Sequence, residues 1–132
     1  MVGVYDSPAS CLYVVMAHTD TVAGTPGAED NASGVGVLAA LARAGVSSRC
    51  DVWLVATGAE ERISTGSPDH LGALALVRRV RRLGRARDLR LALSLDEVGR
   101  GRRMVLRSWS SRRVSSVLRA ARGTGLRVSW SR

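Results

Sequence analysis

Six side chains of the sequence carry the chemistry of a metal site, and they fall in four short segments. They are His18, Asp20, Asp30, Glu60, Glu61 and Asp96. An imidazole nitrogen and carboxylate oxygens are ligands that zinc accepts in proteins. A pair of zinc ions needs a bridging carboxylate and further ligands on each ion, with a water held between the ions. The sequence therefore predicts a metal site, and the ligand set is that of two zinc ions.

The surroundings of these residues suggest a division of roles. Asp20 is close enough in sequence to His18 to accept the second N–H of the imidazole, a common arrangement behind a metal-bound histidine. Asp30 stands at the entry of a predicted helix, after a Gly/Pro-rich loop, and is placed to bridge two ions. Glu60 and Glu61 are consecutive in a turn and point in different directions. One can bind a metal while the other takes a proton from a metal-bound water.

The predicted elements bring these segments together. Apolar runs at 11–16, 51–57 and 91–95 predict buried strands. Helical patterns run from Ala32 or Ser33 to Gly45, and from an N-cap at Ser67 followed by Pro68 to about Leu83. Further along, a strand at 104–107, a helix at 114–121 and a strand at 126–130 are expected. This order predicts an α/β fold with a largely parallel central sheet flanked by helices. Ligands of such sheets bind beyond the carboxyl ends of the strands, where His18, Glu60, Glu61 and Asp96 fall.

Length and composition are those of one globular domain spanning 1–132. The chain has 132 residues, of which 45% are hydrophobic. It contains no apolar run of the roughly 18–20 residues that a membrane span needs, so we expect no transmembrane helix. The first ten residues lack the basic and apolar regions of a secretory signal. We expect no such signal in this chain, and its compartment is left open.

Charge is distributed unevenly, and all 20 basic residues are arginines. Residues 1–75 carry 3 Arg and 8 acids, a net charge of −5, whereas residues 76–132 carry 17 Arg and 3 acids, a net charge of +14. A basic half of this kind is one footprint of nucleic-acid binding. Stacking aromatic residues are not interleaved with the arginines, so that function is disfavoured. Cys11 and Cys50 lack metal-type spacing and are interpreted as buried or edge thiols.

The four segments, taken in order, resemble the two-zinc exopeptidase family of bacterial leucyl aminopeptidases, which also includes glutamate carboxypeptidases and glutaminyl cyclases. The matching motifs extend from His18 to Gly99. They are His18-x-Asp20, Pro26-Gly27-Ala28-x-Asp30-Asn31-Ala32-Ser33-Gly34, Gly58-Ala59-Glu60-Glu61 with Thr65-Gly66-Ser67, and Leu95-Asp96-x-Val98-Gly99.

The resemblance implies a role for each residue. His18 and Asp96 would hold one zinc, Asp30 would bridge, and Glu61 would bind the second zinc. Glu60 would be the general base of a peptide-bond hydrolase, and Asp20 would orient His18. The implied fold is the phosphorylase/hydrolase-like zinc-exopeptidase core, here incomplete, and the implied partner is a peptide substrate. From the composition we expect no membrane as a partner, and nucleic acid is disfavoured. The presence of both His18 and Asp96 favours two metals and so favours peptidase over glutaminyl cyclase chemistry.

Two departures from the family keep a rival hypothesis open. Glu97 follows Asp96 where the family has a small or apolar residue. The family also completes its second zinc site with a histidine toward the C-terminus, whereas no histidine follows His70 here, and His70 itself is a poor substitute. The rival is a truncated or non-catalytic relative that acts as a binding domain. A third hypothesis is nucleic-acid binding through the arginines between positions 78 and 113. The leading hypothesis is a zinc-dependent exopeptidase that acts as an aminopeptidase, although the residues themselves leave open whether it would act from the amino or the carboxyl end.

Overall fold

A computed structural model describes all residues except 1, 6–8, 63–65, 109–113 and 132. Thr65 of the third motif and Arg112 and Arg113 of the basic segment therefore lie outside the described residues. The chain divides into two compact units, residues 1–97 and 98–132, which are described separately. The single domain expected from the sequence stays a prediction.

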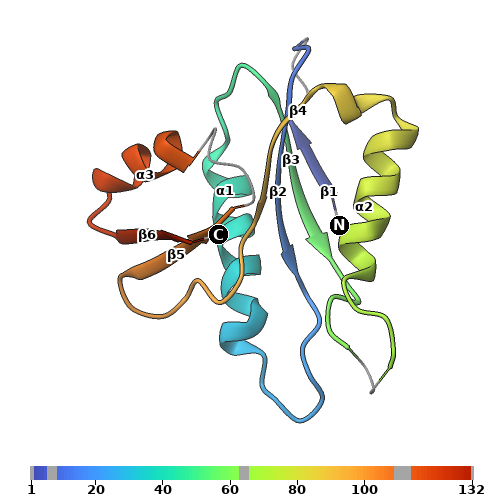
Figure 1. Cartoon of the computed structure of the whole chain (residues 1–132), viewed down its shortest axis with the longest axis vertical. Helices are drawn as coiled ribbons and strands as arrows, with labels where there is room; N and C mark the ends of the chain where they lie inside the picture. The colour runs from blue at the N-terminus through green and yellow to red at the C-terminus, as the bar shows by residue number, and fades with distance from the viewer. Residues whose placement is uncertain (1, 6–8, 63–65, 109–113, 132) are drawn as a thin grey trace. The chain divides into compact units, whose positions relative to one another are not determined.

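The first unit is built on a four-stranded sheet in the order β1-β3-β2-β4 (Figure 1). The central strands β2 (Leu12–His18) and β3 (Asp51–Thr57) pair in parallel along their whole length, so that His18 lies beside Thr57. On the other side of β2, β4 (Leu89–Ser94) also runs parallel. The strand β1 (Val2–Tyr5) pairs antiparallel with β3. The α/β class and the largely parallel sheet are thus confirmed.

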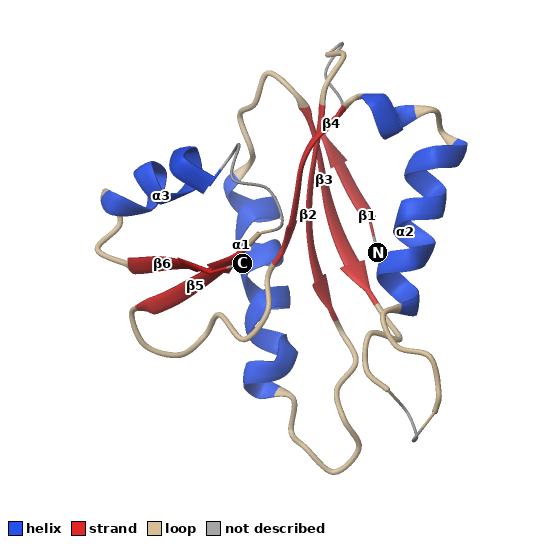
Figure 2. Ribbon diagram, in the orientation of Figure 1, coloured by secondary structure: helices blue, strands red, loops and turns tan. Residues whose placement is uncertain are grey.

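Two helices cover opposite faces of this sheet (Figure 2). Side chains of a strand alternate between its faces. Trp53 and Val55 of β3 pack with Leu76 and Val80 of α2 (Leu71–Arg82). The alternate residues Val52 and Leu54 belong to a second cluster with Leu38 of α1 (Gly34–Ala44). β3 is therefore buried on both faces, which explains its unbroken apolar sequence.

Short irregular turns make the remaining connections of the first unit. The turn η1 (Ala28–Ser33) leads into α1, and a 3₁₀ turn, η2 (Arg85–Arg87), leads from α2 to β4. Arg85 is not a solvated charge, because its guanidinium bonds Asp51 at 2.6 Å and Asp88 at 2.7 Å. The Asp51 carboxylate is buried at the start of β3. Arg85 thus ties the start of β3 to the segment that enters β4.

The second unit is a β-α-β element of its own. β5 (Arg103–Arg107) and β6 (Arg127–Ser131) pair in parallel, and α3 (Val114–Arg122) connects them. These three elements match the sequence prediction within one residue at each end. None of the helices described is long and apolar enough to cross a membrane.

Two element predictions were wrong. β1 was not expected, because four residues at the start of the chain carry too little periodicity to mark a strand. The second helix was expected to begin after Ser67, but α2 begins at Leu71, with His70 as its N-cap. His70 and Leu71 donate their N–H groups to the carbonyls of Glu60 and Ala59. A tertiary contact with a distant turn therefore sets the start of α2, in preference to the local Ser-Pro signal.

The interpretation of the cysteines as thiols was also wrong. Cys11 and Cys50 form a disulfide between the residues that precede β2 and β3. The two positions become neighbours because the parallel strands begin level with one another: the N–H of Asp51 bonds the carbonyl of Cys11. Sequence spacing alone does not show this proximity. The bridge holds the sheet at the end opposite to His18.

Replacing both cysteines by alanine is expected to lower the free energy of unfolding by about 3–4 kcal/mol, because the bridge closes a long loop in the unfolded chain. Urea denaturation followed by tryptophan fluorescence measures the change. The parent protein with reductant should unfold at the same urea concentration as the double variant. A parent whose midpoint does not respond to reductant would contradict this stabilising role.

Candidate metal centre

His18 is the buried centre of the site. It is the last residue of β2 and its side chain is only 4% exposed. Its Nδ1 lies 2.9 Å from the backbone carbonyl oxygen of Asp20. A carbonyl can only accept, so Nδ1 carries the proton, and Nε2 is directed toward Asp30 and Asp96. The nearest carboxylate oxygens of these residues lie 3.1 and 3.2 Å from Nε2.

The surroundings of Nε2 call for a positive charge. Burial alone would lower the pKa of His18, but the hydrogen bonds to the Asp20 carbonyl and the Asp96 carboxylate, with the charges of Asp96 and Asp30, raise it above its usual value. Two carboxylates therefore favour a cation at this nitrogen, either a proton or a metal ion. The donor set is one that zinc accepts.

Asp30 and Glu61 complete a convergent group. One ligand atom each from His18, Asp30 and Glu61 lies within 4.8 Å of the other two. Asp30 adopts a non-helical conformation in η1 and precedes a cis peptide bond to Asn31. Its buried Oδ1 faces Nε2 of His18 at 3.1 Å and has no other possible hydrogen-bond partner among the described residues. A buried carboxylate oxygen is costly to leave unbonded, so a cation at this position fits the residues present.

Asp20 connects the first and third motifs by a contact that the sequence did not predict. Its backbone carbonyl, and not its carboxylate, accepts from His18. The carboxylate oxygen Oδ2 instead accepts from the backbone N–H groups of Glu60 at 3.0 Å and Glu61 at 2.9 Å. Burial alone would raise the pKa of Asp20, but the bonds from Glu61 and Glu60 hold it below its usual value. Asp20 therefore fixes the imidazole and the Glu-Glu turn together.

Glu60 lies beside the convergent group with one free oxygen. Its side chain is 21% exposed, and its Oε2 is buried with no hydrogen-bond partner in the described part of the chain. Its Oε1 is 4.0 Å from Nδ1 of the exposed His70. The turn that carries Glu60 follows β3 directly and includes Ala59 in a left-handed conformation, with φ of 53°. Glu60 is thus held next to Glu61 without being one of the three residues that converge.

Asn31 is a residue of the site that sequence reasoning left out. It is 1% exposed, its amide donates to the carbonyl of Leu95 at 2.8 Å, and its Oδ1 accepts from the N–H of Gly34 at 3.0 Å. A Cβ at Gly34 would lie 2.6 Å from the Leu95 carbonyl oxygen, so only glycine allows this approach. Asn31 therefore fastens the turn that bears Asp30 to the strand end that bears Asp96. Its position directly after Asp30 was the only hint in the sequence that Asn31 belongs to the site. An asparagine at this position is equally well explained as the N-cap of the following helix.

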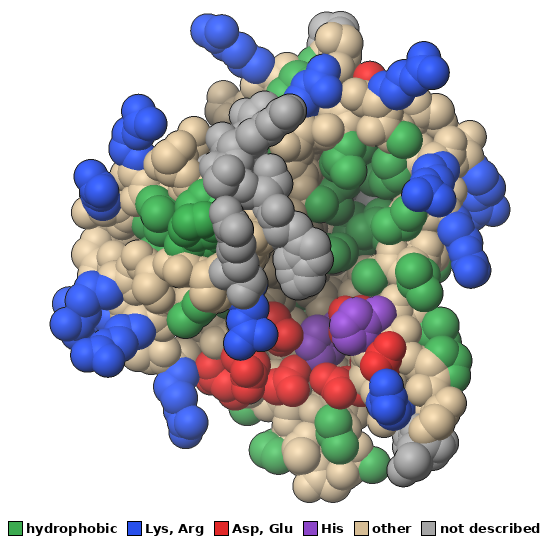
Figure 3. Space-filling model, in the orientation of Figure 1, with side chains coloured by type: hydrophobic (Ala, Val, Ile, Leu, Met, Phe, Trp, Pro, Cys, Tyr) green, Lys and Arg blue, Asp and Glu red, His purple; other side chains and the backbone are tan. Residues whose placement is uncertain are grey.

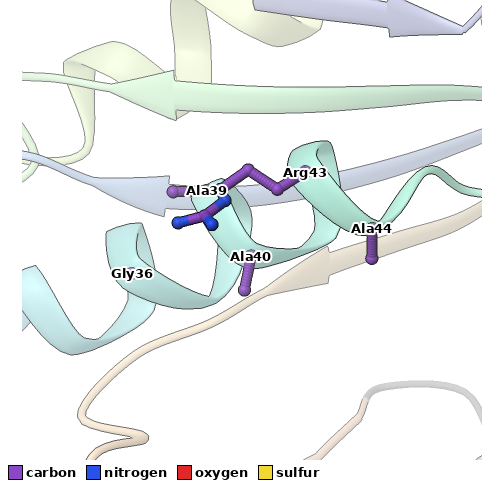
Figure 4. A pocket seen from close by; sticks show the side chains of 5 residues that line it. All are labelled: Gly36, Ala39, Ala40, Arg43 and Ala44. Atoms are coloured by element: carbon purple, nitrogen blue, oxygen red, sulfur yellow. The ribbon is translucent and has the colours of Figure 1, made fainter.

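The hollows of the first unit lie away from this chemistry. One, of about 460 Å³, lies on the outer side of α1, where all its lining residues sit on a single helix (Figure 4). A second, of about 280 Å³, lies between α2 and strands β2 and β4 and is lined almost wholly by apolar residues. Neither includes any of the six predicted site residues. The candidate metal centre is recognised by the side chains of His18 at the carboxyl end of β2, Asp30 in the turn into α1 and Glu61 after β3.

Comparison with known proteins decides the family. The family model described as peptidase family M28 matches residues 2–128. The chain belongs to peptidase family M28. The resemblance drawn from the four ordered motifs is thereby confirmed. No curated protein matches the chain.

Two solved structures share the M28 chain's fold. A glutaminyl cyclase from an Acidobacteriales bacterium superimposes with a TM-score of 0.78 at 19% identity, covering 99% of this chain and 51% of that one. LapB from Legionella pneumophila gives a TM-score of 0.72 at 21% identity, covering 98% and 37%. At these identities the likeness shows the fold alone. The M28 chain spans about half the length of the first protein and little more than a third of the second.

The six predicted site residues lie near the carboxyl ends of the parallel strands of the first unit. His18, Asp30 and Glu61 converge, Asp96 touches His18, Asp20 holds the Glu-Glu turn, and Glu60 is adjacent. The described residues therefore include a group that could bind a metal ion. The roles of these residues in binding or catalysis stay predictions.

Asn31→Ala is expected to lower the free energy of unfolding by about 2–4 kcal/mol, because it leaves the partly buried Leu95 carbonyl and the buried Gly34 N–H without partners. Urea denaturation measures the loss. Thr25→Ala removes a side-chain hydrogen bond to the Val22 carbonyl in an exposed loop and is the control, with a change within about 0.5 kcal/mol. Equal midpoints for the two variants would show that Asn31 is not a structural fastener.

Proposed function

We propose that this chain forms the metal-binding catalytic part of a zinc-dependent exopeptidase that acts as an aminopeptidase. The observation that supports this most is the convergence of His18, Asp30 and Glu61 beside Glu60, whose buried Oε2 has no partner among the described residues. Three ligand-type groups with a free carboxylate next to them are what metal-assisted hydrolysis requires.

Each residue has a proposed task. His18, Asp30, Glu61 and Asp96 would hold the metal, with Asp30 shared between two zinc ions. Zinc bound there would supply a Lewis acid for the scissile carbonyl and lower the pKa of a bound water to about 7. Glu60 would take the proton of the attacking water and later deliver it to the leaving amine. Asp20 would fix the positions of the imidazole and of the two glutamates relative to one another.

The charge of the site supports the amino-terminal direction of cleavage. The acids that follow β2, β3 and β4 gather at one end of the first unit, around the histidines (Figure 3). They are Asp20, Glu29, Asp30, Glu60, Glu61, Asp96 and Glu97. Arg62, which follows Glu61, is paired with Asp69 at 2.9 Å. A surface of this kind attracts the α-ammonium group of a peptide and repels a terminal carboxylate.

Glu60→Gln is expected to reduce the hydrolysis of an aminoacyl p-nitroanilide by about 10²–10⁴-fold, because the proton acceptor is lost. Zinc content, measured by elemental mass spectrometry, should stay at the parental value. Glu29→Gln is the matched control, since Glu29 is also an acid at this end of the unit but lies outside the convergent group, and it should retain parental activity. A zinc-loaded Glu60→Gln protein that hydrolyses the substrate at the parental rate would exclude Glu60 as the base.

A second candidate function is that of a non-catalytic relative that binds metal weakly or at one site only. Within the described residues, the convergent group consists of His18, Asp30 and Glu61 and does not include His70, so it offers fewer ligands than two zinc ions need. Metal stoichiometry separates the two functions. We expect two zinc ions per dialysed chain if the proposed peptidase site is complete. One ion or none, together with no hydrolysis of the reporter, would favour the binding domain.

A further inference from the structure

The turn that carries Glu60 and Glu61 is held by hydrogen bonds from two parts of the chain. On one side, the carboxylate of Asp20 accepts from both of its N–H groups. On the other side, the start of α2 donates to its carbonyls. The N–H of His70 bonds the carbonyl of Glu60, and the N–H of Leu71 bonds that of Ala59, each at 2.9 Å. The N–H groups at a helix start lack partners within the helix. Here the turn of the candidate site supplies those partners.

The approach of α2 to this turn leaves no room for a side chain at Gly72. A Cβ built on Gly72 would lie 2.9 Å from both Gly58 N and Thr57 Cβ, and nearer still to the carbonyl oxygen of Gly58. The obstacles are backbone atoms and the root of a side chain at the end of β3, so none of them can swing aside. Any larger residue at position 72 must push the helix start away from the turn.

Both partners of the contact also have unusual backbone conformations. Ala59 has φ of 53° and His70 has φ of 56°, and neither is a glycine. Left-handed conformations of this kind persist only where surrounding contacts hold them. The two hydrogen bonds at the start of α2 are such contacts, because one involves Ala59 and the other involves His70.

We propose that the start of α2 is a backbone clamp for the site and that Gly72 is a positioning residue for Glu60 and Glu61. The clamp, defined by Gly72 and the N–H groups of His70 and Leu71, sets where the two glutamates stand relative to His18 and Asp30. The inference rests on the proposed function for its chemical meaning, but the clamp is itself a property of the metal-free chain. A glycine within a helix normally weakens it by comparison with alanine. Gly72 is therefore expected to be the better residue only because of the turn.

The test compares Gly72→Ala with Gly36→Ala, a matched change in α1 where an added Cβ would meet nothing within 4 Å. Amide hydrogen exchange is measured by NMR on the metal-free proteins, and zinc affinity by competition with a chromophoric chelator. In Gly72→Ala we expect the N–H groups of Glu60 and Glu61 to exchange at least tenfold faster, while those of Val14 and Leu54 keep their parental rates. Zinc affinity should fall at least tenfold. Gly36→Ala should match the parent in both measurements.

Each result decides a separate claim. Parental exchange at Glu60 and Glu61 in Gly72→Ala would overturn the clamp. Faster exchange with unchanged zinc affinity would overturn the positioning role. A parent protein that binds no zinc would overturn the proposed function, while the exchange rates would still decide the clamp.

A second variant covers the case in which Gly72→Ala loses protection at Val14 and Leu54 as well. Replacing the Leu71 amide by an ester in a semisynthetic chain removes one N–H and adds no atom that could clash. The control is the same change at Leu83, whose N–H bonds the carbonyl of Arg79 at the far end of α2. The Leu71 ester should speed exchange at Glu60 and Glu61 at least tenfold relative to the Leu83 ester. Equal rates in the two esters would overturn the clamp.

Discussion

The level, parallel pairing of β2 with β3 and β4 is the constraint on which the rest of the first unit depends. Because the three strands run in the same direction and start together, their carboxyl ends lie at the same end of the sheet. His18 ends β2, the Glu-Glu turn follows β3, and Asp96 follows β4. A shift of register by one residue would reverse the face of every side chain on a strand and would take His18 out of reach of its partners. The apolar clusters with α1 and α2 on the two faces of the sheet fix that register.

Buried hydrogen bonds then convert this coarse arrangement into a defined site. Asp20 joins the end of β2 to the turn after β3, and Asn31 joins the turn before α1 to the end of β4. Each joins two segments that are distant in sequence, and each bonds partly buried backbone groups that would otherwise lack a protein partner. The hydrogen bonds of Asp20 and Asn31 thus fix the backbone that carries the more exposed acids.

The arrangement of carboxylates that favours a bound cation at this site also destabilises the folded chain when no cation is bound. Several carboxylates stand around one imidazole. The buried Oε2 of Glu60 has no hydrogen-bond partner among the described residues, and the buried Oδ1 of Asp30 faces only Nε2 of His18. Burial alone would lower the pKa of His18, but its hydrogen bonds and the charges of Asp96 and Asp30 raise it, so these surroundings favour a cation. The rest of the first unit offsets this cost through its two apolar clusters and the Cys11–Cys50 bridge at the opposite end of the sheet. A bound metal ion would relieve the same imbalance, which is the physical reason to expect one at this group.

The sequence by itself determined the α/β class, the three parallel strands, the family and the identity of the six candidate residues. These follow from local patterns: unbroken apolar runs, helical periodicity and four motifs in a fixed order. Only the tertiary structure decided the disulfide, the start of α2, the antiparallel β1, the role of the Asp20 carboxylate and the part played by Asn31. All five depend on contacts between segments far apart in the chain. Local propensity carries no information about such contacts, because the partner groups become neighbours only when the sheet has formed.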